Sequence, residues 1–309
     1  MIGIESKYIW MDGKLVESEK ATVPFLSTAL HYGLGVFEGI RCYSTDRGPA
    51  VFRLKEHIDR LVNSAKILGF NSLPYTSVEL VEATKETIRA NGFKACYIRP
   101  LIYHHNSSSL GLNLDGGEAR VGIAVWEWGR YLGDESIEKG VRANVSSFTR
   151  HHPNIAMTKA KITGNYANSV LAKTESARLG FDEAIMLDPQ GYVAECSGEN
   201  IFVVRHGVIY TTQTAVILEG ITRDALISLA KDWGYTVVEQ LIGRDQLYIA
   251  DEVFVCGTAA EVVPVTEIDF RQIGDGAIGP VTRQIQQAFM AVISGSHPRS
   301  AEWLEYVNN

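Results

Sequence analysis

The chain lacks the features that mark disulfide-rich, zinc-binding and membrane-spanning proteins. Its 309 residues include four scattered cysteines with no C-x-x-C pair, which are Cys42, Cys96, Cys196 and Cys256. That spacing argues against a disulfide framework and against a metal site, so we expect free thiols in a reducing compartment and no metal. No stretch approaches about 20 consecutive apolar residues, so we expect no membrane-spanning helix.

Blocks of like charge, low-complexity tracts and internal repeats are also missing. The net charge is −7, with 21% of the residues charged, and gives no reason to expect a nucleic-acid or membrane-surface partner. The first ten residues contain Glu5 and Lys7 and no apolar core, so they do not resemble a signal peptide. We therefore expect a cytoplasmic protein.

What the chain has is the length of about two domains, and 46% of its residues are hydrophobic, enough for a sizeable core. Strand and helix patterns are mixed without strict βαβ alternation, which favours an α+β fold over a doubly wound sheet. The stretch from Trp128 to Asp134 has no periodicity and predicts the connection between domains. We place a smaller N-terminal α/β domain in residues 1–128, an interdomain loop in 129–135 and a larger C-terminal domain in 136–309.

The N-terminal half carries turn and helix signals. Asp12-Gly13 predicts a hairpin turn. Apolar residues at helical spacing predict a helix over residues 57–68. A second helix is predicted to begin at Thr76, where Glu79 stands three residues later as in a capping box.

Two further stretches of this half are candidates for strands. Residues 31–43 mix glycines with aromatic residues, which fits either a bulged strand or the wall of a pocket. Residues 93–103 have the pattern of a strand, in which Tyr97 and Arg99 project from the same face because they are two residues apart. Pro100 has no amide proton, so this strand lies at a sheet edge or its neighbour ends there.

The C-terminal half continues the mixture of strands and helices. Gly220 opens a helix whose predicted core face is formed by Leu226, Leu229, Ala230 and Trp233. The other predicted helices cover residues 165–179 and 280–293, and the predicted strands cover residues 141–148, 181–187, 192–196, 200–205, 208–211 and 253–256.

The candidate chemistry centres on Lys161, just ahead of the helix predicted over residues 165–179. A lysine amine at the mouth of a turn of small residues can form a Schiff base with an aldehyde, and pyridoxal 5'-phosphate is the obvious aldehyde cofactor. The same amine could carry a proton as a general acid–base. Spacing alone leaves Lys159 as an alternative to Lys161.

Such a cofactor needs a phosphate site and an acid for its ring nitrogen. The helix start at Gly220–Thr222 points backbone N–H groups at an anion, but a helix end contributes at most about 2 kcal/mol toward a charge. A guanidinium such as that of Arg60, or the turn at Gly257-Thr258, would add the missing attraction. Glu195 ends a predicted strand among small residues and is the candidate acid.

Six motifs together resemble the class IV (fold-type-IV) aminotransferases. The family resemblance comes first from the four motifs KITGNY at 161–166, ECSGENIF at 195–202, GITRD at 220–224 and GTAAE at 257–261. The motifs FEGIRCY at 37–43 and YIRP at 97–100 narrow it to the branched-chain amino-acid aminotransferases. The match runs from about Trp10 to Phe289. It implies a fold like that of D-amino-acid aminotransferase, in which the larger C-terminal domain is a pseudo-barrel.

The resemblance also implies roles by position. It selects Lys161 over Lys159 as the lysine that carries the cofactor. The residues implied at the cofactor are Tyr166 near the ring hydroxyl, Glu195 at the pyridine nitrogen, and Arg60, Ile221, Thr222 and Thr258 at the phosphate. The residues implied at the substrate are Thr258, Ala259 and Tyr97 for the α-carboxylate, Arg99 for the distal carboxylate of 2-oxoglutarate, and Phe37, Tyr32, Trp128, Tyr131 and Tyr166 for the apolar side chain.

The implied reaction moves the amino group of L-leucine, L-isoleucine or L-valine to 2-oxoglutarate, and back, in branched-chain amino-acid biosynthesis. A homodimer or a trimer of dimers is implied, with Leu110 and Leu112 reaching into a partner subunit. Cys196 departs from the glycine that the family often has there, and residues 104–109 and 150–158 do not match closely.

Other readings of the same motifs remain open. They are a D-amino-acid aminotransferase, an (R)-amine transaminase, an aminodeoxychorismate lyase, and a vitamin carrier or structural dimer without catalysis. The segments 37–43 and 97–100 argue against the first three. A carrier needs a phosphate cradle but has no use for Glu195.

Overall fold

The computed structural model describes residues 5–106, 108–129, 131–133 and 135–308. The chain divides into two compact units, which are unit 1 (residues 1–128, 160–165 and 292–309) and unit 2 (residues 129–159 and 166–291). The first boundary coincides with the predicted end of the N-terminal domain. Residues 160–165 and 292–309, however, group with unit 1 and not with the C-terminal part of the chain. Of the predicted interdomain loop, positions 130 and 134 lie outside the described residues.

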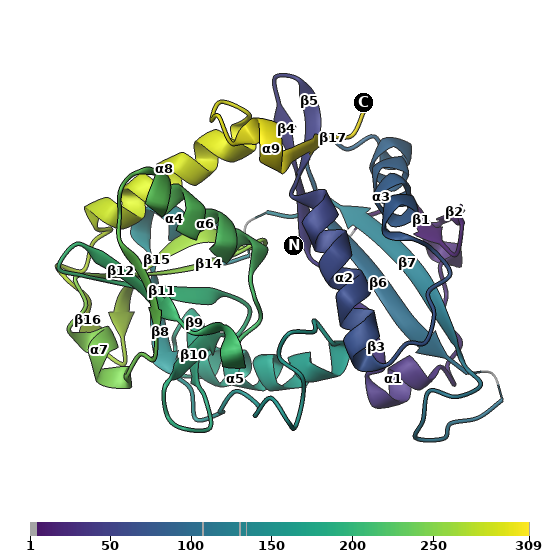
Figure 1. Ribbon diagram of the computed structural model, residues 1–309, viewed down its shortest axis with the longest axis horizontal. Helices are drawn as coiled ribbons and strands as arrows, with labels where there is room; N and C mark the ends of the chain where they lie inside the picture. Colours follow the sequence, from purple (N-terminus) through teal and green to yellow (C-terminus); the bar gives the residue numbers. More distant parts are fainter. Residues whose placement is uncertain (1–4, 107, 130, 134, 309) are drawn as a thin grey trace. The chain divides into compact units, whose positions relative to one another are not determined.

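Unit 1 is an antiparallel sheet with two long helices on one face. Its elements are β1 (Tyr8–Met11), β2 (Lys14–Glu17), η1 (Ser18–Lys20), α1 (Thr28–Tyr32), β3 (Gly35–Phe37), β4 (Ile40–Thr45), β5 (Gly48–Phe52), α2 (Leu54–Leu68), α3 (Ser77–Asn91), β6 (Cys96–His105), β7 (Glu118–Trp126), η2 (Thr163–Asn165), α9 (Ser300–Trp303) and β17 (Leu304–Tyr306). Within the described residues the strand order is β17-β5-β4-β6-β7-β1-β2, and β3 also pairs with β6. Helices α2 and α3 lie across this sheet (Figure 1), and side chains such as Leu61, Ile88 and Ile98 form the core between them.

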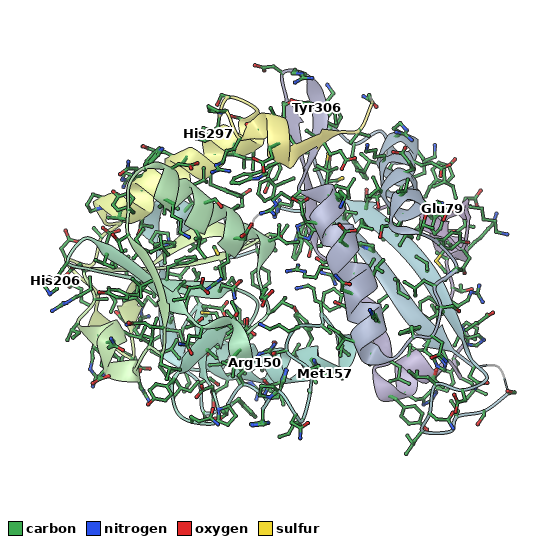
Figure 2. The ribbon with its side chains drawn as sticks, in the orientation of Figure 1. Glu79, Arg150, Met157, His206, His297 and Tyr306 are labelled. Carbon is green, nitrogen blue, oxygen red and sulfur yellow. The ribbon has the colours of Figure 1, made fainter. Side chains whose placement is uncertain are left out.

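Local sequence explains the ends of these elements. The hairpin β1–β2 turns at Asp12 and Gly13, whose φ angles are 45° and 92°, as predicted. Helix α2 begins at Leu54, earlier than predicted, and Leu54 is fully buried. Helix α3 starts after a capping box in which the Thr76 hydroxyl accepts the Glu79 N–H at 3.3 Å and the Glu79 carboxylate accepts the Thr76 N–H at 2.8 Å. Glu79 is labelled in Figure 2.

Strand β6 is internal to the sheet, and Pro100 marks a break in its neighbour. Strand β4 pairs with β6 as far as Ile98, and β3 pairs with it from Leu101 onward. Between them the Glu38 N–H donates to the carbonyl of Pro100 at 3.0 Å. The prediction of an edge strand is therefore wrong, and the alternative, in which the neighbour ends at the proline, is confirmed.

Unit 2 is built on a second, mixed sheet. Its elements are α4 (Ser136–Lys139), β8 (Val141–Val145), α5 (Tyr166–Arg178), β9 (Glu183–Leu187), β10 (Val193–Cys196), β11 (Asn200–Arg205), β12 (Val208–Thr212), η3 (Thr214–Val216), α6 (Ile221–Asp232), β13 (Val237–Gln240), α7 (Arg244–Tyr248), β14 (Glu252–Gly257), β15 (Glu261–Ile268), β16 (Arg271–Gln272) and α8 (Pro280–Ser294), whose last residues belong to unit 1. In the part of the chain that the structure describes, the strand order is β10-β9-β8-β15-β14-β11-β12-β13, and β16 pairs with β15.

The two ends of this strand order return toward each other. Tyr192, directly before β10, forms an isolated antiparallel bridge with Gly243, after β13. The Val193 N–H also donates to the carbonyl of Ile242 at 2.9 Å. The sheet therefore curls as the implied pseudo-barrel requires, and its mixture of strands and helices confirms the α+β class.

Helix α6 begins after Gly220 as predicted and buries Leu226, Leu229 and Ala230. Trp233 is 39% exposed, because it lies past the last helical residue, so its prediction as a core residue is wrong. The hairpin β11–β12 turns at His206 (labelled in Figure 2) and Gly207, as predicted. Among the described residues, no helix combines the length and apolar character needed to cross a membrane.

Candidate active site

Residues 160–165 run beside strand β3 of unit 1. Ile162 forms an antiparallel bridge with Val36, and the Phe37 N–H donates to the carbonyl of Lys161 at 3.0 Å. The N–H of Lys161 donates to the hydroxyl of Ser64 on α2, also at 3.0 Å. The backbone of Lys161 is thus held from both sides by the elements of unit 1.

The glycines of this region permit a close approach of two backbones. A Cβ added at Gly33 would lie 2.7 Å from the Cα of Gly164, and Gly33 has a φ of 67°. The Thr163 hydroxyl donates to the carbonyl of Gly33 at 2.8 Å and fixes the same contact. The small residues after Lys161 therefore have a structural reason, independent of chemistry.

The two neighbouring lysines are in different surroundings. The Nζ of Lys159 lies 2.8 Å from the carboxylate of Glu219 and also donates to the carbonyl of Thr214, so its charge is taken up by an ion pair. The Nζ of Lys161 lies 5.1 Å from the centre of the Phe37 ring, in a cation–π contact. The two lysines are thus held differently, Lys159 by a carboxylate of unit 2 and Lys161 against an aromatic ring of unit 1.

Strand β6 places Tyr97 and Arg99 on one face, as predicted from their spacing. The Nη2 of Arg99 donates to the Tyr97 hydroxyl at 3.0 Å, and the guanidinium carbon lies 4.6 Å from the centre of the Phe37 ring. The Tyr97 ring packs edge-on against Trp128, with 4.7 Å between ring centres. The Nε of Arg99 is buried and has no hydrogen-bond partner among the described residues. This face combines aromatic rings with a buried donor suited to an anion.

Gly39 is required for the position of the Tyr97 hydroxyl. A Cβ at Gly39 would lie 2.1 Å from that oxygen, well inside van der Waals contact. The Tyr97 side chain is 4% exposed and packed between two tryptophans, so it has little room to move away. Gly39, between β3 and β4, thus leaves room for the Tyr97 hydroxyl, which is a candidate to bind the substrate.

Arg60, a predicted phosphate ligand, is held by a buried carboxylate. Its Nε and Nη2 donate to Glu38 at 2.6 and 2.9 Å, a bidentate pair, and the Nδ1 of His57 lies 2.8 Å from the same carboxylate. Burial alone would raise the pKa of the Glu38 carboxyl, but Arg60 and His57 hold it well below its usual range. Burial lowers the pKa of His57 despite the charge of Glu38. The guanidinium of Arg60 is therefore fixed in one orientation.

Glu195, in unit 2, is paired with an arginine as well. Its Oε1 lies 2.6 Å from the Nε of Arg150. Its Oε2 accepts from the side-chain amide of Asn200 at 3.3 Å and from the Leu218 N–H at 3.1 Å. Figure 2 labels Arg150 in the stretch between β8 and α5. Both charged side chains are less than one-tenth exposed, so this ion pair lies in a low-dielectric setting.

The start of α6 is joined to Glu195 through Asn200. The amide of Asn200 also donates to the carbonyl of Leu218 at 3.1 Å, and a Cβ at Gly220 would lie 2.0 Å from its Oδ1. Gly220 provides no side-chain cap, so the first N–H groups of α6 keep their donor capacity for an anion. Thr222 is 2% exposed, and its hydroxyl has no hydrogen-bond partner among the described residues.

The remaining predicted residues lie on several elements. Thr258 and Ala259 form the turn between β14 and β15, and the carbonyl of Ala259 accepts the Tyr131 N–H at 3.2 Å. Ile221 and Tyr166 are the first residues of α6 and α5. Tyr32, at the end of α1, is 41% exposed, and its hydroxyl donates to the carbonyl of Leu110 at 2.8 Å.

Sequence reasoning missed several supporting residues. Asn200 beside Glu195 and Glu38 beside Arg60 stand inside recognised motifs, so their polar character in a buried strand end was a usable signal. Arg150 had no such signal, because it lies in an aperiodic stretch far along the chain from its partner.

Known proteins are similar to this chain in sequence and in fold. A family model described as amino-transferase class IV matches residues 35–268. The chain belongs to this family. Branched-chain-amino-acid aminotransferases of Pseudomonas aeruginosa PAO1 and Escherichia coli K12 are similar to it at 50% identity (96% of this chain and 95% of the relative) and 47% identity (98% of each).

Solved structures of the family share the fold over nearly the whole chain. A T.th. branched-chain amino acid aminotransferase, complexed with N-(5'-phosphopyridoxyl)-L-glutamate, has a TM-score of 0.94 at 50% identity and covers 99% of this chain and 100% of its own. The Escherichia coli enzyme has a TM-score of 0.96 at 47% identity, with 98% and 100% covered. The resemblance of the six motifs to class IV aminotransferases is thereby confirmed.

Proposed function

We propose that this class IV aminotransferase transfers the amino group of L-leucine, L-isoleucine or L-valine to 2-oxoglutarate, and catalyses the reverse reaction, in branched-chain amino-acid biosynthesis. The observation that carries this proposal is the face of unit 1 on which the Arg99 guanidinium lies over the Phe37 ring. A branched aliphatic chain needs apolar surface, and the distal carboxylate of 2-oxoglutarate needs a cation. The names of the similar enzymes described above support the same choice.

Pyridoxal 5'-phosphate is the proposed cofactor, and the residues present fit its phosphate. Thr222 offers a buried hydroxyl without a partner among the described residues, directly at the start of a twelve-residue helix. We assign Ile221, Thr222 and Thr258 to the phosphate, together with Arg60, whose guanidinium is oriented by Glu38. When bound, the cofactor supplies an electron sink for the carbanion at the substrate Cα.

The chain's own residues bind and move protons around this cofactor. Lys161 would hold the aldehyde carbon and carry the proton to and from the substrate Cα. Glu195, held in place by Arg150 and Asn200, would keep the pyridine nitrogen protonated, and Tyr166 would hydrogen-bond the ring hydroxyl. In these roles the carboxylate faces the protonated ring nitrogen, and the lysine amine faces the carbon that reacts.

Substrate recognition divides into three parts. The N–H groups of Thr258 and Ala259, with the Tyr97 hydroxyl, would bind the α-carboxylate. Arg99 would bind the distal carboxylate through its buried Nε. The apolar side chain would lie among Phe37, Tyr32, Trp128, Tyr131 and Tyr166.

We further propose a homodimer, or a trimer of dimers, in the cytoplasm. Unit 1 exposes several large apolar side chains, at 59% or more of their surface, in or near α1 and in the loop after β6, namely Phe25, Leu26, Leu30 and Leu112. Exposed apolar side chains in such numbers are typical of a protein interface. We assign Leu110 and Leu112 to the contact with a partner subunit. The four buried, unbridged cysteines support a reducing compartment.

A panel of amino donors tests the reaction. The purified holoenzyme is mixed with L- and D-amino acids in turn, without acceptor, and the change in cofactor absorbance is recorded. We expect L-leucine, L-isoleucine, L-valine and L-glutamate to react. A response to D-amino acids or to (R)-amines alone would replace the proposal with one of the rival class IV activities.

Borohydride reduction followed by peptide mapping tests the lysine. We expect the label on Lys161 and no turnover by Lys161→Ala. The matched control is Lys159→Ala, which should keep the label in place. Label on Lys159, or on no lysine, would contradict the assignment.

A further inference from the structure

Unit 2 contains a lysine–glutamate pair with a buried carboxylate, which none of the roles above uses. Lys173, on α5, pairs with Glu183, the first residue of β9. The Glu183 side chain is fully buried and that of Lys173 is 26% exposed. Lys173 also donates to the carbonyl of Asp182 at 2.5 Å. A buried ion pair of this kind calls for a reason, because it is weak evidence for stability on its own.

The carboxylate of Glu183 is satisfied on both oxygens. Its Oε2 faces Lys173, and its Oε1 accepts the Ala184 N–H at 2.8 Å and the Ser197 N–H at 3.2 Å. The Ser197 hydroxyl donates to the same Oε1 at 2.5 Å. A serine hydroxyl has a single proton, so that of Ser197 is committed to Glu183.

Tyr131 is attached to this pair at two points. The Tyr131 hydroxyl interacts with that of Ser197, and because Ser197 gives its proton to Glu183, the Tyr131 hydroxyl is the one with a proton to donate. The Nζ of Lys173 lies 5.0 Å from the centre of the Tyr131 ring, in a cation–π contact. A third anchor is the backbone bond from Tyr131 to Ala259 in the β14–β15 turn.

The charge states of these groups sustain the arrangement at neutral pH. Burial, more than any other cause, raises the pKa of Tyr131 to about 12, so the phenol keeps the proton that it donates. Burial alone would lower the pKa of Lys173, but the charge of Glu183 holds it above its ordinary value. The lysine therefore stays an ammonium under the ring.

We infer that Ser197, Glu183 and Lys173 are positioning residues that hold Tyr131 for the apolar side chain of the substrate. The inference rests on the proposed role of Tyr131 in that pocket. The Tyr131 hydroxyl is engaged by Ser197 and the ring is fixed by the ammonium. The side chain thereby offers ring surface in one place instead of a mobile polar group. These residues would set the preference for apolar over charged substrates without touching either.

Binding of two inert acids to the holoenzyme tests the inference. Calorimetry gives the dissociation constants of two acids. 4-Methylpentanoic acid has an apolar side chain, and glutarate has a second carboxylate, which Arg99 would bind. Ser197→Ala is expected to raise the dissociation constant of 4-methylpentanoic acid about tenfold, which is the scale of a lost apolar contact. The dissociation constant of glutarate should change by less than about twofold. Equal changes for both acids, or none, would overturn the inference.

A double-mutant cycle with Tyr131→Phe gives a second, independent result. The phenylalanine keeps the ring but has no hydroxyl to donate, so adding Ser197→Ala to it should have no further effect on 4-methylpentanoic acid. Additive effects would mean that Ser197 does not act through Tyr131. Lys173→Arg should retain wild-type selectivity where Lys173→Met loses it.

The controls separate positioning from simple destabilisation. Ser176→Ala removes a different buried serine hydroxyl, which lies on α5 and has no partner among the described residues. This variant should leave both dissociation constants unchanged. Thermal unfolding of each variant shows whether it is folded. If the wild type binds neither acid, the proposed function itself fails. If the wild type binds both acids and Ser197→Ala changes both dissociation constants equally or not at all, only the positioning role fails.

Discussion

Each unit contains a buried glutamate with an arginine and a histidine beside it, but the two groups are connected differently. The groups are the Glu38 group (Glu38, His57 and Arg60, in unit 1) and the Glu195 group (Glu195, Arg150 and His151, in unit 2). In the first, the carboxylate is the centre, and both the arginine and the histidine bond to it. In the second, the arginine is the centre, with the carboxylate 2.6 Å from its Nε and the His151 Nδ1 3.4 Å from its Nη1.

The difference indicates different purposes. Glu38 has 0% exposure and is bonded to the side chains of both His57 and Arg60. Its charge is therefore paired inside unit 1, where it orients Arg60. Glu195 pairs with Arg150 through one oxygen, and its other oxygen accepts from an amide and a backbone N–H. Stability should therefore depend more on the Glu38 group, and chemistry more on the Glu195 group.

The largest expected effect is the loss of stability in Glu38→Gln. Removing one partner of a buried ion pair destabilises a protein by about 3–5 kcal/mol, because the remaining charge is left uncompensated. Here Arg60 would lose its bidentate acceptor. Urea unfolding of the cofactor-free protein measures the change as a lower midpoint. Glu195→Gln is the comparison, and the two groups would not differ in purpose if it were destabilised as much.

The next effect is the loss of activity in Glu195→Gln. An amide cannot balance a protonated pyridine nitrogen, and removing one electrostatic stabiliser from an active site lowers kcat by about 10²–10³-fold. Steady-state rates with L-leucine and 2-oxoglutarate at saturating cofactor measure this effect. Glu38→Gln, assayed at a temperature at which it is folded, should lose less. A Glu195→Gln enzyme with wild-type turnover would remove Glu195 from the chemistry.

The two groups also differ in how far the sequence could predict them. Tyr97 and Arg99 were placed on one face by the period of a strand, and Thr76 with Glu79 by a local capping pattern, because both depend on neighbours in the chain. The motif at 195–202 identifies Glu195 and the family resemblance identifies Arg60, but neither reveals the partner of that residue. Arg150 and Glu195 meet because β9 and β10 curl beside the stretch that follows β8, and no local pattern encodes that encounter.

A smaller effect is expected from Arg150→Met, which removes the charged partner of Glu195 but keeps the volume. We expect kcat/KM to fall by about 10- to 100-fold, in line with a charge-assisted contact of about 1.5–3 kcal/mol. Cofactor affinity, measured by fluorescence during dialysis, should fall in parallel. Arg150→Lys should recover part of the loss, since it restores the charge without the guanidinium geometry. An unchanged cofactor affinity in Arg150→Met would separate Arg150 from the role of Glu195.

The smallest expected effect is a loss of stability at acidic pH. Both histidines lower the free energy of unfolding as the pH falls. Burial lowers the pKa of His57, and burial with the charge of Arg150 lowers that of His151 to about 4. The unfolded chain takes up protons on these imidazoles near pH ~6.5, while the folded chain does not, so the free energy of unfolding decreases as pH falls from about 7 toward 4.

The two histidines should differ in the size of this contribution. His57 is fully buried, and its Nε2 has no hydrogen-bond partner among the described residues, so protonation would add a buried N–H without an acceptor. The Nε2 of His151 also has no partner among the described residues, but the residue as a whole is only partly buried, so desolvation is greater at His57. Melting temperatures of His57→Gln and His151→Gln at pH 7 and pH 5 measure the difference. His57→Gln should flatten the pH dependence more, and a larger flattening in His151→Gln would reverse the order of the two groups.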